Sequence, residues 1–319
     1  MSGPTPTPAD PAGEAGPAAE RVTVVVVTYS PGEHLTEFLE SLGAAAQAPP
    51  RVIIVDNGST DGSVEQAARR DGVRLISTGS NLGFGAAANI GVREADTDWV
   101  LVANPDVVWR AGTIDRLLAA ADRWPSAAAV GPAITTPDGQ LYPSARLIPT
   151  IGIGAGHAAL GSLWPRNRWT RAYRAEAQAI DERSTGWISG SCMLMRKSAF
   201  DAVGGFDAGY FMYFEDVDLC ARLHDAGYDV VYAPGAVVLH NQGHAANREP
   251  GRMVAEHHRS AYRFLAHRHP GPQWAPVRLL MRLGLSIRLT VAQRSAKVRG
   301  GAPPQRSASE LERQRTDQD

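Results

Sequence analysis

The chain has 319 residues, enough for one large α/β domain or two smaller ones. Hydrophobic residues (44%) and charged residues (20%) occur as in ordinary soluble globular proteins, and no run of 18 apolar residues predicts a transmembrane helix. The formal net charge is only −1, yet residues 257–309 contain ten Arg and Lys and no Asp or Glu. A basic segment on a neutral body predicts an anionic partner.

The first 20 residues are rich in Pro, Ala, Gly and Thr and have neither a cationic start nor an apolar segment. This composition predicts a disordered leader rather than a signal peptide or a membrane anchor. Cys192 and Cys220 are far apart and lie in apolar contexts. Buried reduced thiols are therefore favoured over a disulfide or a metal site, and a reducing compartment fits.

The N-terminal third alternates apolar runs with helical periodicity. Residues 22–27 and 52–55 are continuous β-branched runs, typical of strands buried on both faces of a parallel sheet. Helical spacing follows each run, which predicts βαβ units and a doubly wound α/β sheet. Functional groups are expected at the carboxyl ends of the strands, which singles out residues 28–30 and 56–60.

A third strand, residues 73–77, leads into a glycine-containing loop that begins at Asn81 and becomes a helix of small residues. Gly83 and Gly85 suggest a dinucleotide fingerprint, but Ala88 stands where its third glycine belongs, and the loop does not follow the first strand. A nicotinamide site is therefore disfavoured.

A fourth strand, residues 99–103, ends in Asn104-Pro105-Asp106. Proline has no amide hydrogen, so the strand stops there and Asp106 lies at its carboxyl end. An Asx turn without a functional role is an equally good interpretation of this tripeptide alone.

The remaining pattern predicts further elements in chain order. They are a helix at 113–124, a strand at 127–131, an irregular segment at 144–185, one strand at 187–195, a short helix from 197, a helix from about 215, and two short strands at 229–232 and 236–240. His240 is the last residue of the final strand.

Three carboxylates, Glu215, Asp216 and Asp218, follow a run of large side chains at residues 210–214. The predicted helix places them in its first turn, where the helix dipole favours negative charge. If the motif stands alone, these acids are best interpreted as ordinary charges at a helix start. If other site residues lie nearby, one of the three carboxylates is better interpreted as a catalytic base beside an apolar wall.

Four residues share positions where a doubly wound sheet collects its ligands: Asp56, Asp106, Asp216 and His240. Carboxylates with an imidazole suit Mg²⁺ or Mn²⁺ on a substrate diphosphate. Zinc is disfavoured because no Cys or His pair has ligand spacing. A single histidine is more often structural, but this constellation favours a ligand.

Seven motifs carry a family resemblance. They are Val-Thr-Tyr at 27–29, Val-Asp-Asn-Gly-Ser-Thr-Asp-Gly at 55–62, Asn-Leu-Gly-Phe-Gly-Ala-Ala-Ala-Asn at 81–89, Asn-Pro-Asp at 104–106, Gly-Ser-Cys-Met-Leu-Met-Arg at 190–196, Phe-Glu-Asp-Val-Asp-Leu at 214–219 and His240. Over residues 21–270 the chain resembles the inverting family 2 glycosyltransferases. The resemblance implies a GT-A fold, a Rossmann-like mixed, mainly parallel sheet flanked by helices, here with a C-terminal helical extension.

Within that family the chain is most similar to actinobacterial rhamnosyltransferases, which transfer L-rhamnose from dTDP-rhamnose to N-acetylglucosaminyl-diphospho-decaprenol in cell-wall linker synthesis. Residues 142–146 and 164–169 strengthen this similarity. The resemblance implies a nucleotide-sugar donor, a polyprenyl-diphosphate-linked acceptor, and Mg²⁺ or Mn²⁺ as cofactor.

The resemblance also implies roles for single residues. Asp216 is the expected general base, and Asp106 and His240 are the expected metal ligands; Asn104 replaces the first acid of the family's DxD motif, which implies weak, substrate-dependent metal binding. The remaining donor-binding candidates are Thr28, Tyr29, Asp56, Asn81, Gly85, Asn104 and Asp106. The acceptor-binding candidates are Glu215, Asp218, Trp187 and Tyr213, with Tyr210 and Phe211 lining the same site.

The C-terminal region alternates arginines with leucines and isoleucine over residues 276–292. This pattern predicts a basic amphipathic helix on an anionic membrane surface at the inner face of the plasma membrane, rather than a nucleic-acid partner. The alternative is packing on the domain or on a second subunit in a homodimer. The expected organisation is a leader (1–20), a transferase domain (21–245), a basic helical region (246–300) and a disordered tail (301–319).

Two other functions stay open from the sequence. One is a family 2 transferase with another nucleotide-sugar donor or a polysaccharide acceptor. The other, from a different class, is a non-catalytic nucleotide-sugar-binding scaffold at the membrane, which the intact set of acids disfavours.

Overall fold

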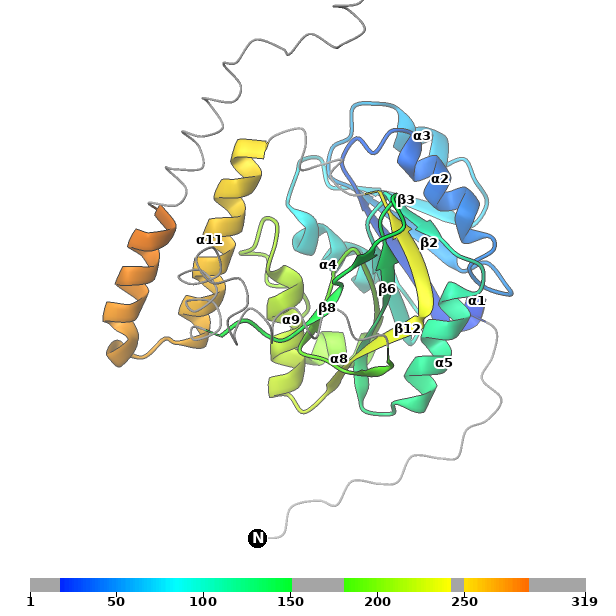
Figure 1. Ribbon diagram of the computed structural model, residues 1–319. Coiled ribbons are helices and arrows are strands. Elements are labelled where there is room, and N and C mark those ends of the chain that lie inside the picture. The colour runs from blue at the N-terminus through cyan, green and yellow to red at the C-terminus, as the bar shows by residue number, and fades with distance from the viewer. Residues whose placement is uncertain (1–17, 151–180, 242–249, 287–319) are drawn as a thin grey trace, which may run out of the picture. The chain divides into compact units, whose positions relative to one another are not determined.

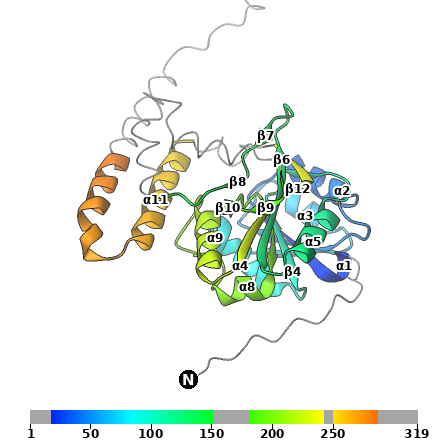
Figure 2. The ribbon, with the colours of Figure 1, turned by 60° about the horizontal axis from the view of Figure 1, so that its bottom comes forward.

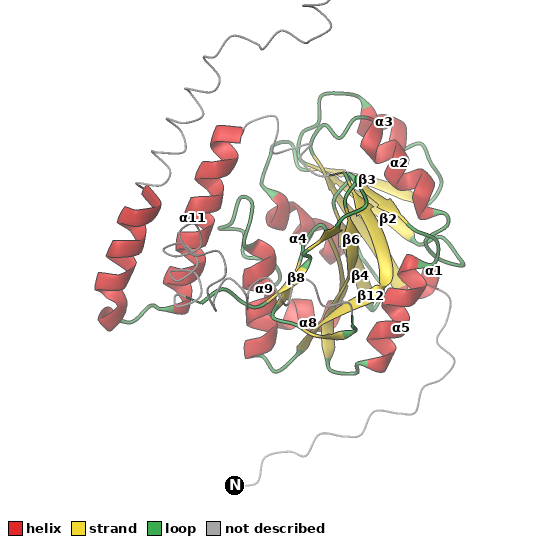
Figure 3. Cartoon of the chain, viewed as in Figure 1, coloured by secondary structure: helices red, strands yellow, loops and turns green. Residues whose placement is uncertain are grey.

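The computed structural model describes residues 18–150, 181–241 and 250–286. The chain divides into two compact units, Met1–Arg248 and Glu249–Asp319. The first unit holds a large sheet between two layers of helices (Figures 1 and 3).

The sheet has the strand order β3-β2-β1-β4-β11-β6-β12-β5. Its strands are β1 (Val22–Thr28), β2 (Arg51–Asp56), β3 (Val73–Ser77), β4 (Trp99–Ala103), β5 (Val107–Trp109), β6 (Ala127–Thr135), β11 (Cys192–Arg196) and β12 (Asp229–His240). The short β7 (Leu141–Tyr142) and β9 (Arg183–Ser184) pair with β6 and β12, and β8 (Ala145–Arg146) pairs with β10 (Trp187–Ile188) in a separate ladder. Strands β1, β2, β3, β4, β6 and β12 all run in one direction, which confirms the mixed, mainly parallel sheet.

The helices of this unit cover both faces of the sheet (Figure 2). They are α1 (Ala18–Arg21), α2 (Glu33–Leu42), α3 (Ser63–Ala67), α4 (Phe84–Glu94), α5 (Thr113–Arg123), α8 (Lys197–Ala202) and α9 (Glu215–Asp225). Helices α2, α3 and α5 pack on one face, and α4, α8 and α9 pack on the other. Val24 and Val26 of β1 face the first layer while Val25 and Val27 face the second, which is why the strand is apolar throughout.

Small residues bring α4 close to the sheet. A Cβ at Gly91 would collide with the side chains of Val25 and Val55. The alanine-rich sequence of α4 therefore reflects close packing of the helix on β1 and β2, and its amino end is held near the carboxyl ends of both strands.

The structure corrects three element predictions. The single strand at 187–195 is wrong: β10 belongs to the ladder with β8, β11 belongs to the main sheet, and Ser189, Gly190 and Ser191 form the crossing. The two strands at 229–232 and 236–240 are one strand, β12, whose register shifts between Ala233 and Val237. Pro234 and Gly235 are absorbed in that irregularity instead of ending the strand.

The third correction concerns strand lengths. Strand β6 continues to Thr135, beyond the predicted end at 131, and β5 follows Asp106 where the sequence predicted no strand. Only three residues long, β5 gives too short a pattern to recognise, but it pairs with the end of β12 and places His240 opposite Val107.

The second unit contains α11 (Pro250–Arg268), a short 3₁₀ helix η1 (Pro272–Trp274) and a helix over residues 275–286. None of the helices in the described segments is long and apolar enough to cross a membrane. The first 17 residues, most of the irregular 144–185 segment and the tail at 301–319 lie outside the described residues, whereas α1 already begins at Ala18.

Candidate active site

The carboxyl ends of β1 and β2 hold Asp56 in a closed polar turn. Thr28 Oγ1 donates a hydrogen bond to Asp56 Oδ1 at 2.9 Å, and the backbone N–H groups of Gly58 and Ser59 donate to Oδ2 at 3.1 and 3.0 Å. The Ser59 hydroxyl also donates to Oδ1. Asp56 is only 5% exposed, so its carboxylate is fixed before any ligand arrives.

The loops after β1 and β2 are bound to each other. The backbone N–H of Ser30 donates to Ser59 Oγ at 2.7 Å, and that of Thr60 donates to Ser30 Oγ at 3.1 Å. Tyr29, between them, is 44% exposed and can meet a ligand at this edge. The predicted neighbours Thr28, Tyr29 and Asp56 thus lie together.

The loop at 80–84 is anchored by Asn57, which lies in the segment 56–60 that the sequence singled out, although no role was predicted for Asn57 itself. Asn57 Nδ2 donates to the Gly83 carbonyl at 3.2 Å, and Asn81 Oδ1 accepts from the Gly83 N–H at 3.0 Å. Gly83 has φ +87°, and a Cβ there would collide with the carbonyl oxygen of Phe211. Glycine is therefore required where this loop touches the segment before α9.

Asp106 and His240 meet at the opposite part of the same strand edge. His240 Nε2 lies 3.0 Å from Asp106 Oδ1, and Asn104 Nδ2 lies 3.4 Å from the same imidazole nitrogen. Burial alone would raise the pKa of Asp106, but the hydrogen bond and charge of His240 outweigh it and hold that pKa below its ordinary value. His240 Nδ1 is buried with no hydrogen-bond partner among the described residues.

The structure brings together the two side chains that the sequence predicted as metal ligands, and their role as ligands stays a prediction. Their carboxylate and imidazole suit Mn²⁺ or Mg²⁺. Across residues 18–150, 181–241 and 250–286, no three His, Cys, Asp or Glu side chains gather as a metal cluster. A metal held here would therefore take most of its ligands from substrate and water.

Asp216 lies in the first turn of α9, as predicted. Its Oδ2 accepts a hydrogen bond from the backbone N–H of Gly190 at 2.9 Å, and its Oδ1 accepts one from Val217 at 2.8 Å. Burial raises its pKa above the ordinary value, against the lowering effect of these N–H groups and of Arg146. The helix start alone was expected to keep Asp216 ionised, but burial is the larger influence on its pKa.

Glu215 is 7% exposed, and its Oε2 has no hydrogen-bond partner among the described residues. Burial and the neighbouring charge of Asp216 raise the pKa of Glu215 to about 8. Asp216 accepts two backbone N–H groups that favour its ionised form, whereas burial and the charge of Asp216 favour the protonated form of Glu215.

The chain enters α9 through two strained residues. Tyr213 and Phe214 have φ values of 68° and 67°, in the left-handed region that non-glycine residues rarely adopt. This turn aims the first residues of α9 at the loop of Gly190. Strain of this kind persists where surrounding contacts fix the backbone, as at many functional sites.

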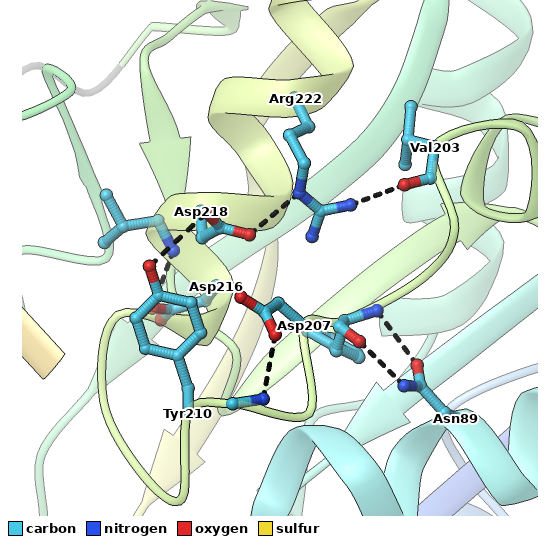
Figure 4. A network of polar contacts seen from close by, with 10 residues as sticks. Asn89, Val203, Asp207, Tyr210, Asp216, Asp218 and Arg222 are labelled. Atoms are coloured by element: carbon cyan, nitrogen blue, oxygen red, sulfur yellow. Dashed lines mark hydrogen bonds and ion pairs between the residues drawn. The ribbon is translucent and has the colours of Figure 1, made fainter. Parts of the chain in front are cut away.

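Asp218 is engaged by its own helix and by the preceding loop (Figure 4). Arg222 Nε donates to Asp218 Oδ2 at 2.8 Å, and Arg222 Nη1 donates to the Val203 carbonyl at 2.6 Å. Tyr210 contacts the other carboxylate oxygen at 3.4 Å. These contacts favour a role in holding the loop before α9, while the predicted acceptor contact of Asp218 stays a prediction.

Asn89 of α4 makes a second clamp on this loop (Figure 4), with hydrogen bonds of 2.8 and 2.9 Å to the backbone carbonyl and N–H of Phe206. Neither Asn89 nor Arg222 was predicted as a site residue. The only sequence signal was the spacing of Asp218 and Arg222, four residues apart on one helix.

Trp187 lies on the ladder of β8 and β10. It pairs in register with Arg146, and its Nε1 donates to the Leu147 carbonyl at 3.1 Å. The guanidinium carbon of Arg146 lies 5.5 Å from the Trp187 ring and 5.7 Å from the Tyr142 ring. The acceptor contact predicted for Trp187 stays a prediction, and Arg146 was not a candidate.

The crossing Ser189–Ser191 connects the two halves of the site. Its Gly190 N–H binds Asp216, and its Ser191 carbonyl accepts the N–H of Asn104 at 2.9 Å. Gly85 allows α4 to approach Phe206 and Glu215 closely, since a Cβ at this position would lie 2.9 Å from Phe206 Cβ and 3.5 Å from Glu215 Cβ. The crossing thus connects the fixed carboxylate of Asp216 to the Asp106–His240 pair, and such an arrangement suits activation of a hydroxyl beside a bound diphosphate.

Comparison with known structures supports the fold. The mannosyltransferase PcManGT of Pyrobaculum calidifontis, solved with GDP-Man and Mn²⁺, superposes with a TM-score of 0.55 at 18% identity and covers 95% of this chain and 82% of that one. GalNAc-T7 with UDP, GalNAc and Mn²⁺ gives a TM-score of 0.51 at 14% identity, over 70% and 44%. The expected GT-A fold is confirmed.

Sequence comparison is more specific. The N-acetylglucosaminyl-diphospho-decaprenol L-rhamnosyltransferase of Mycobacterium tuberculosis is 52% identical over 285 residues, which cover 86% of this chain and 93% of that protein. The rhamnosyltransferase WbbL of Escherichia coli is 27% identical over 77% of this chain and 92% of its own length. Residues 23–204 match the model of "Glycosyl transferase family 2", and residues 166–266 match "Glycosyl transferase family group 2". The chain therefore belongs to glycosyl transferase family 2.

Proposed function

We propose that this protein transfers L-rhamnose, with inversion, from dTDP-rhamnose to an N-acetylglucosaminyl-diphospho-polyprenol in cell-wall synthesis. The observation that carries the proposal is the 52% identity over 285 residues to a protein named for that reaction. The site supports it because a carboxylate suited to act as a base lies beside groups suited to a diphosphate.

Asp216 acts as the general base. Its carboxylate takes the proton from the acceptor hydroxyl as the hydroxyl oxygen attacks the anomeric carbon of the donor sugar; the bond from that carbon to the diphosphate oxygen breaks on the opposite side. The Gly190 and Val217 N–H groups hold the carboxylate in place and favour its ionised form. Neutral Glu215 beside it adds no second charge at pH 7.

Asp56, Thr28 and Tyr29 bind the nucleoside, with Asn81 and Gly85 shaping the loop above the sugar. The Asp56 carboxylate is already oriented by Thr28 and Ser59, so binding costs little further ordering. Exposed Tyr29 offers a ring face to the base.

Asp106 and His240 hold a divalent metal, with Asn104 beside them. No group in the described part of the chain fixes Nδ1 of His240, so the imidazole can adopt the tautomer that presents Nε2 toward a ligand. When bound, the metal neutralises negative charge on the leaving diphosphate. Two solved structures with this fold contain Mn²⁺, in keeping with Mn²⁺ or Mg²⁺ here.

The helix at residues 275–286 brings the protein to the inner membrane surface. Leu279, Leu280 and Leu283 are 57%, 70% and 52% exposed, and Arg278 and Arg282 lie among them. Exposed leucines with arginines suit an anionic interface.

Vesicle binding tests the membrane proposal. Replacing Leu280 with Glu should reduce sedimentation with anionic vesicles, whereas Leu141→Glu, at another exposed leucine, should not. Equal binding of the two variants would contradict the membrane role and favour packing against another protein surface.

A donor panel tests the function. Purified protein is given GlcNAc-diphospho-farnesol and, separately, dTDP-rhamnose, UDP-glucose and GDP-mannose. Product with dTDP-rhamnose alone supports the proposal. Product with another sugar would favour a different family 2 transferase, and donor binding without any product would favour a non-catalytic scaffold.

A further inference from the structure

We propose that Arg146, stacked between Tyr142 and Trp187 beside Asp216, is the binding group for the acceptor's diphosphate and so selects sugars carried on a diphospho-lipid. This inference rests on the proposed function. It adds a residue and a ligand chemistry that the family's metal and base positions do not provide.

The first support is the way in which Arg146 is held. Its guanidinium carbon lies 5.7 and 5.5 Å from the ring centroids of Tyr142 and Trp187, and its Nε donates to the Pro143 carbonyl at 2.8 Å. The two aromatic rings and the Pro143 carbonyl restrict the guanidinium, so a ligand that binds it needs little further ordering of this side chain. A planar cation fixed in this way matches two oxygens of a phosphate group.

The second support is the position of Arg146 relative to the base. Arg146 pairs with Trp187 of β10, and three residues later the crossing to β11 contains Gly190, whose N–H binds Asp216. Burial raises the pKa of Asp216, and the positive charge of Arg146 acts on this carboxylate in the opposite direction. Arg146 therefore lies within electrostatic reach of the carboxylate that must contact the acceptor hydroxyl.

The third support is the separation from the donor. Asp56, Asp106 and His240 lie at strand ends of the main sheet, whereas Arg146 lies on the separate ladder of β8 and β10. The acceptor sugar must approach Asp216 from the side away from the donor diphosphate, because inversion requires attack opposite the leaving group. A cation on this ladder is therefore in a position to bind the acceptor rather than the donor.

The chemical structure of the acceptor fits a site in which a cation lies near the base. One sugar ring separates the attacking hydroxyl from the diphosphate on its anomeric oxygen. With the hydroxyl at Asp216, the diphosphate is close enough to meet a cation that also acts on Asp216 through space. The uncharged rings of Tyr142 and Trp187 suit the sugar and the first part of the lipid.

Arg146→Gln and Arg146→Lys test the assignment, with Arg183→Gln as the matched control. Arg183 stacks on Tyr232 at 4.9 Å but lies on β9, at the far end of β12 from His240. The acceptors are GlcNAc-diphospho-farnesol and the neutral octyl glycoside of GlcNAc. Binding of both to each protein is measured by calorimetry, alongside transfer kinetics and the Kd of dTDP-rhamnose.

We expect Arg146→Gln to weaken binding of the diphosphate acceptor and to raise its KM by roughly 10- to 100-fold, because charge-assisted hydrogen bonds are lost. Binding of the neutral glycoside and of dTDP-rhamnose should be unchanged, Arg146→Lys should be intermediate, and Arg183→Gln should match the wild type. An equal loss for both acceptors would instead assign Arg146 to supporting Asp216, and weaker donor binding would assign it to the donor; either result overturns the inference.

The proposed function can fail separately. If the wild-type protein binds GlcNAc-diphospho-farnesol in an Arg146-dependent way but transfers no rhamnose, the anion site stands and the donor assignment is wrong. If the wild-type protein transfers rhamnose and Arg146→Gln behaves as wild type with both acceptors, only the present inference is overturned.

Discussion

The backbone N–H of Gly190 donates a 2.9 Å hydrogen bond to Oδ2 of Asp216 across 26 residues of sequence. A Cβ at Gly190 would lie 3.3 Å from Asp216 Cβ and 3.5 Å from the ring of Phe84. The glycine thus allows the crossing between two sheets to approach the start of α9 and to fix one rotamer of the Asp216 side chain.

Gly190→Ala should misplace the base without unfolding the protein. The added methyl group pushes Asp216 by a few tenths of an ångström, so kcat should fall roughly 10-fold or more while the Kd of the donor is unchanged. Gly235→Ala is the control, because a Cβ there meets nothing within 4 Å. Equal kcat for the two variants would contradict a positioning role for Gly190.

Gly83→Ala should destabilise the fold. The residue has φ +87°, and the new Cβ would collide with the Phe211 carbonyl oxygen, which also accepts the Phe84 N–H at 3.1 Å. Thermal unfolding should show a loss on the order of 2–4 kcal/mol, the combined effect of strain and a displaced loop. Gly139→Ala is the control, because Gly139 has φ +79° but open space around it, and this variant should lose less stability. Equal losses of stability in the two variants would show that the backbone angle, and not the collision with Phe211, causes the effect.

Glu215→Gln should alter how stability depends on pH. The pKa of Glu215 is raised to about 8 in the folded protein, from an ordinary value of 4.5. The folded state therefore holds a proton that the unfolded state releases, and wild-type stability is lost as pH rises from about 4.5 through 8. Glutamine mimics the protonated side chain and avoids that loss.

We therefore expect Glu215→Gln to be more stable than the wild type above pH 8, by a difference on the order of 5 kcal/mol, and about equally stable near pH 4.5. Urea unfolding at both pH values measures this. A constant difference across the range would mean that Glu215 does not titrate as described.

His240→Ala should raise the metal concentration needed for half-maximal activity by roughly 10- to 100-fold, because the buried pair loses its imidazole. Chelation should abolish activity of the wild type, and added Mn²⁺ should restore it. His258→Gln, on α11, serves as the control. Full activity of exhaustively chelated protein would remove Asp106 and His240 from metal binding.

The sequence predicted those features that depend on local patterns. The apolar runs of β1, β2 and β4 were recognisable because both of their faces are buried, and Pro105 marked the strand end after which Asp106 lies. The helix start at Glu215 followed from the acids and the apolar spacing after them. The buried, unpaired state of Cys192 and Cys220 was also predicted correctly.

Features that depend on distant partners were not predictable. The break between β10 and β11 exists because two different sheets recruit the flanking residues, and neither sheet is visible in the local sequence. Asn57 and Asn89 bind backbone groups of loops far along the chain, so the local sequence did not indicate their partners. Burial of Glu215 likewise comes from tertiary packing.

The central claim is that Asp216 is the base of a rhamnosyl transfer. The most direct measurement is the rate at which Asp216→Asn, compared with the wild type, forms rhamnosyl product from dTDP-rhamnose and GlcNAc-diphospho-farnesol, with donor Kd measured on the same samples. We predict an unchanged donor Kd and a kcat lower by roughly 100-fold or more. A variant with near wild-type kcat, or a wild-type protein that forms no rhamnosyl product, would contradict the account.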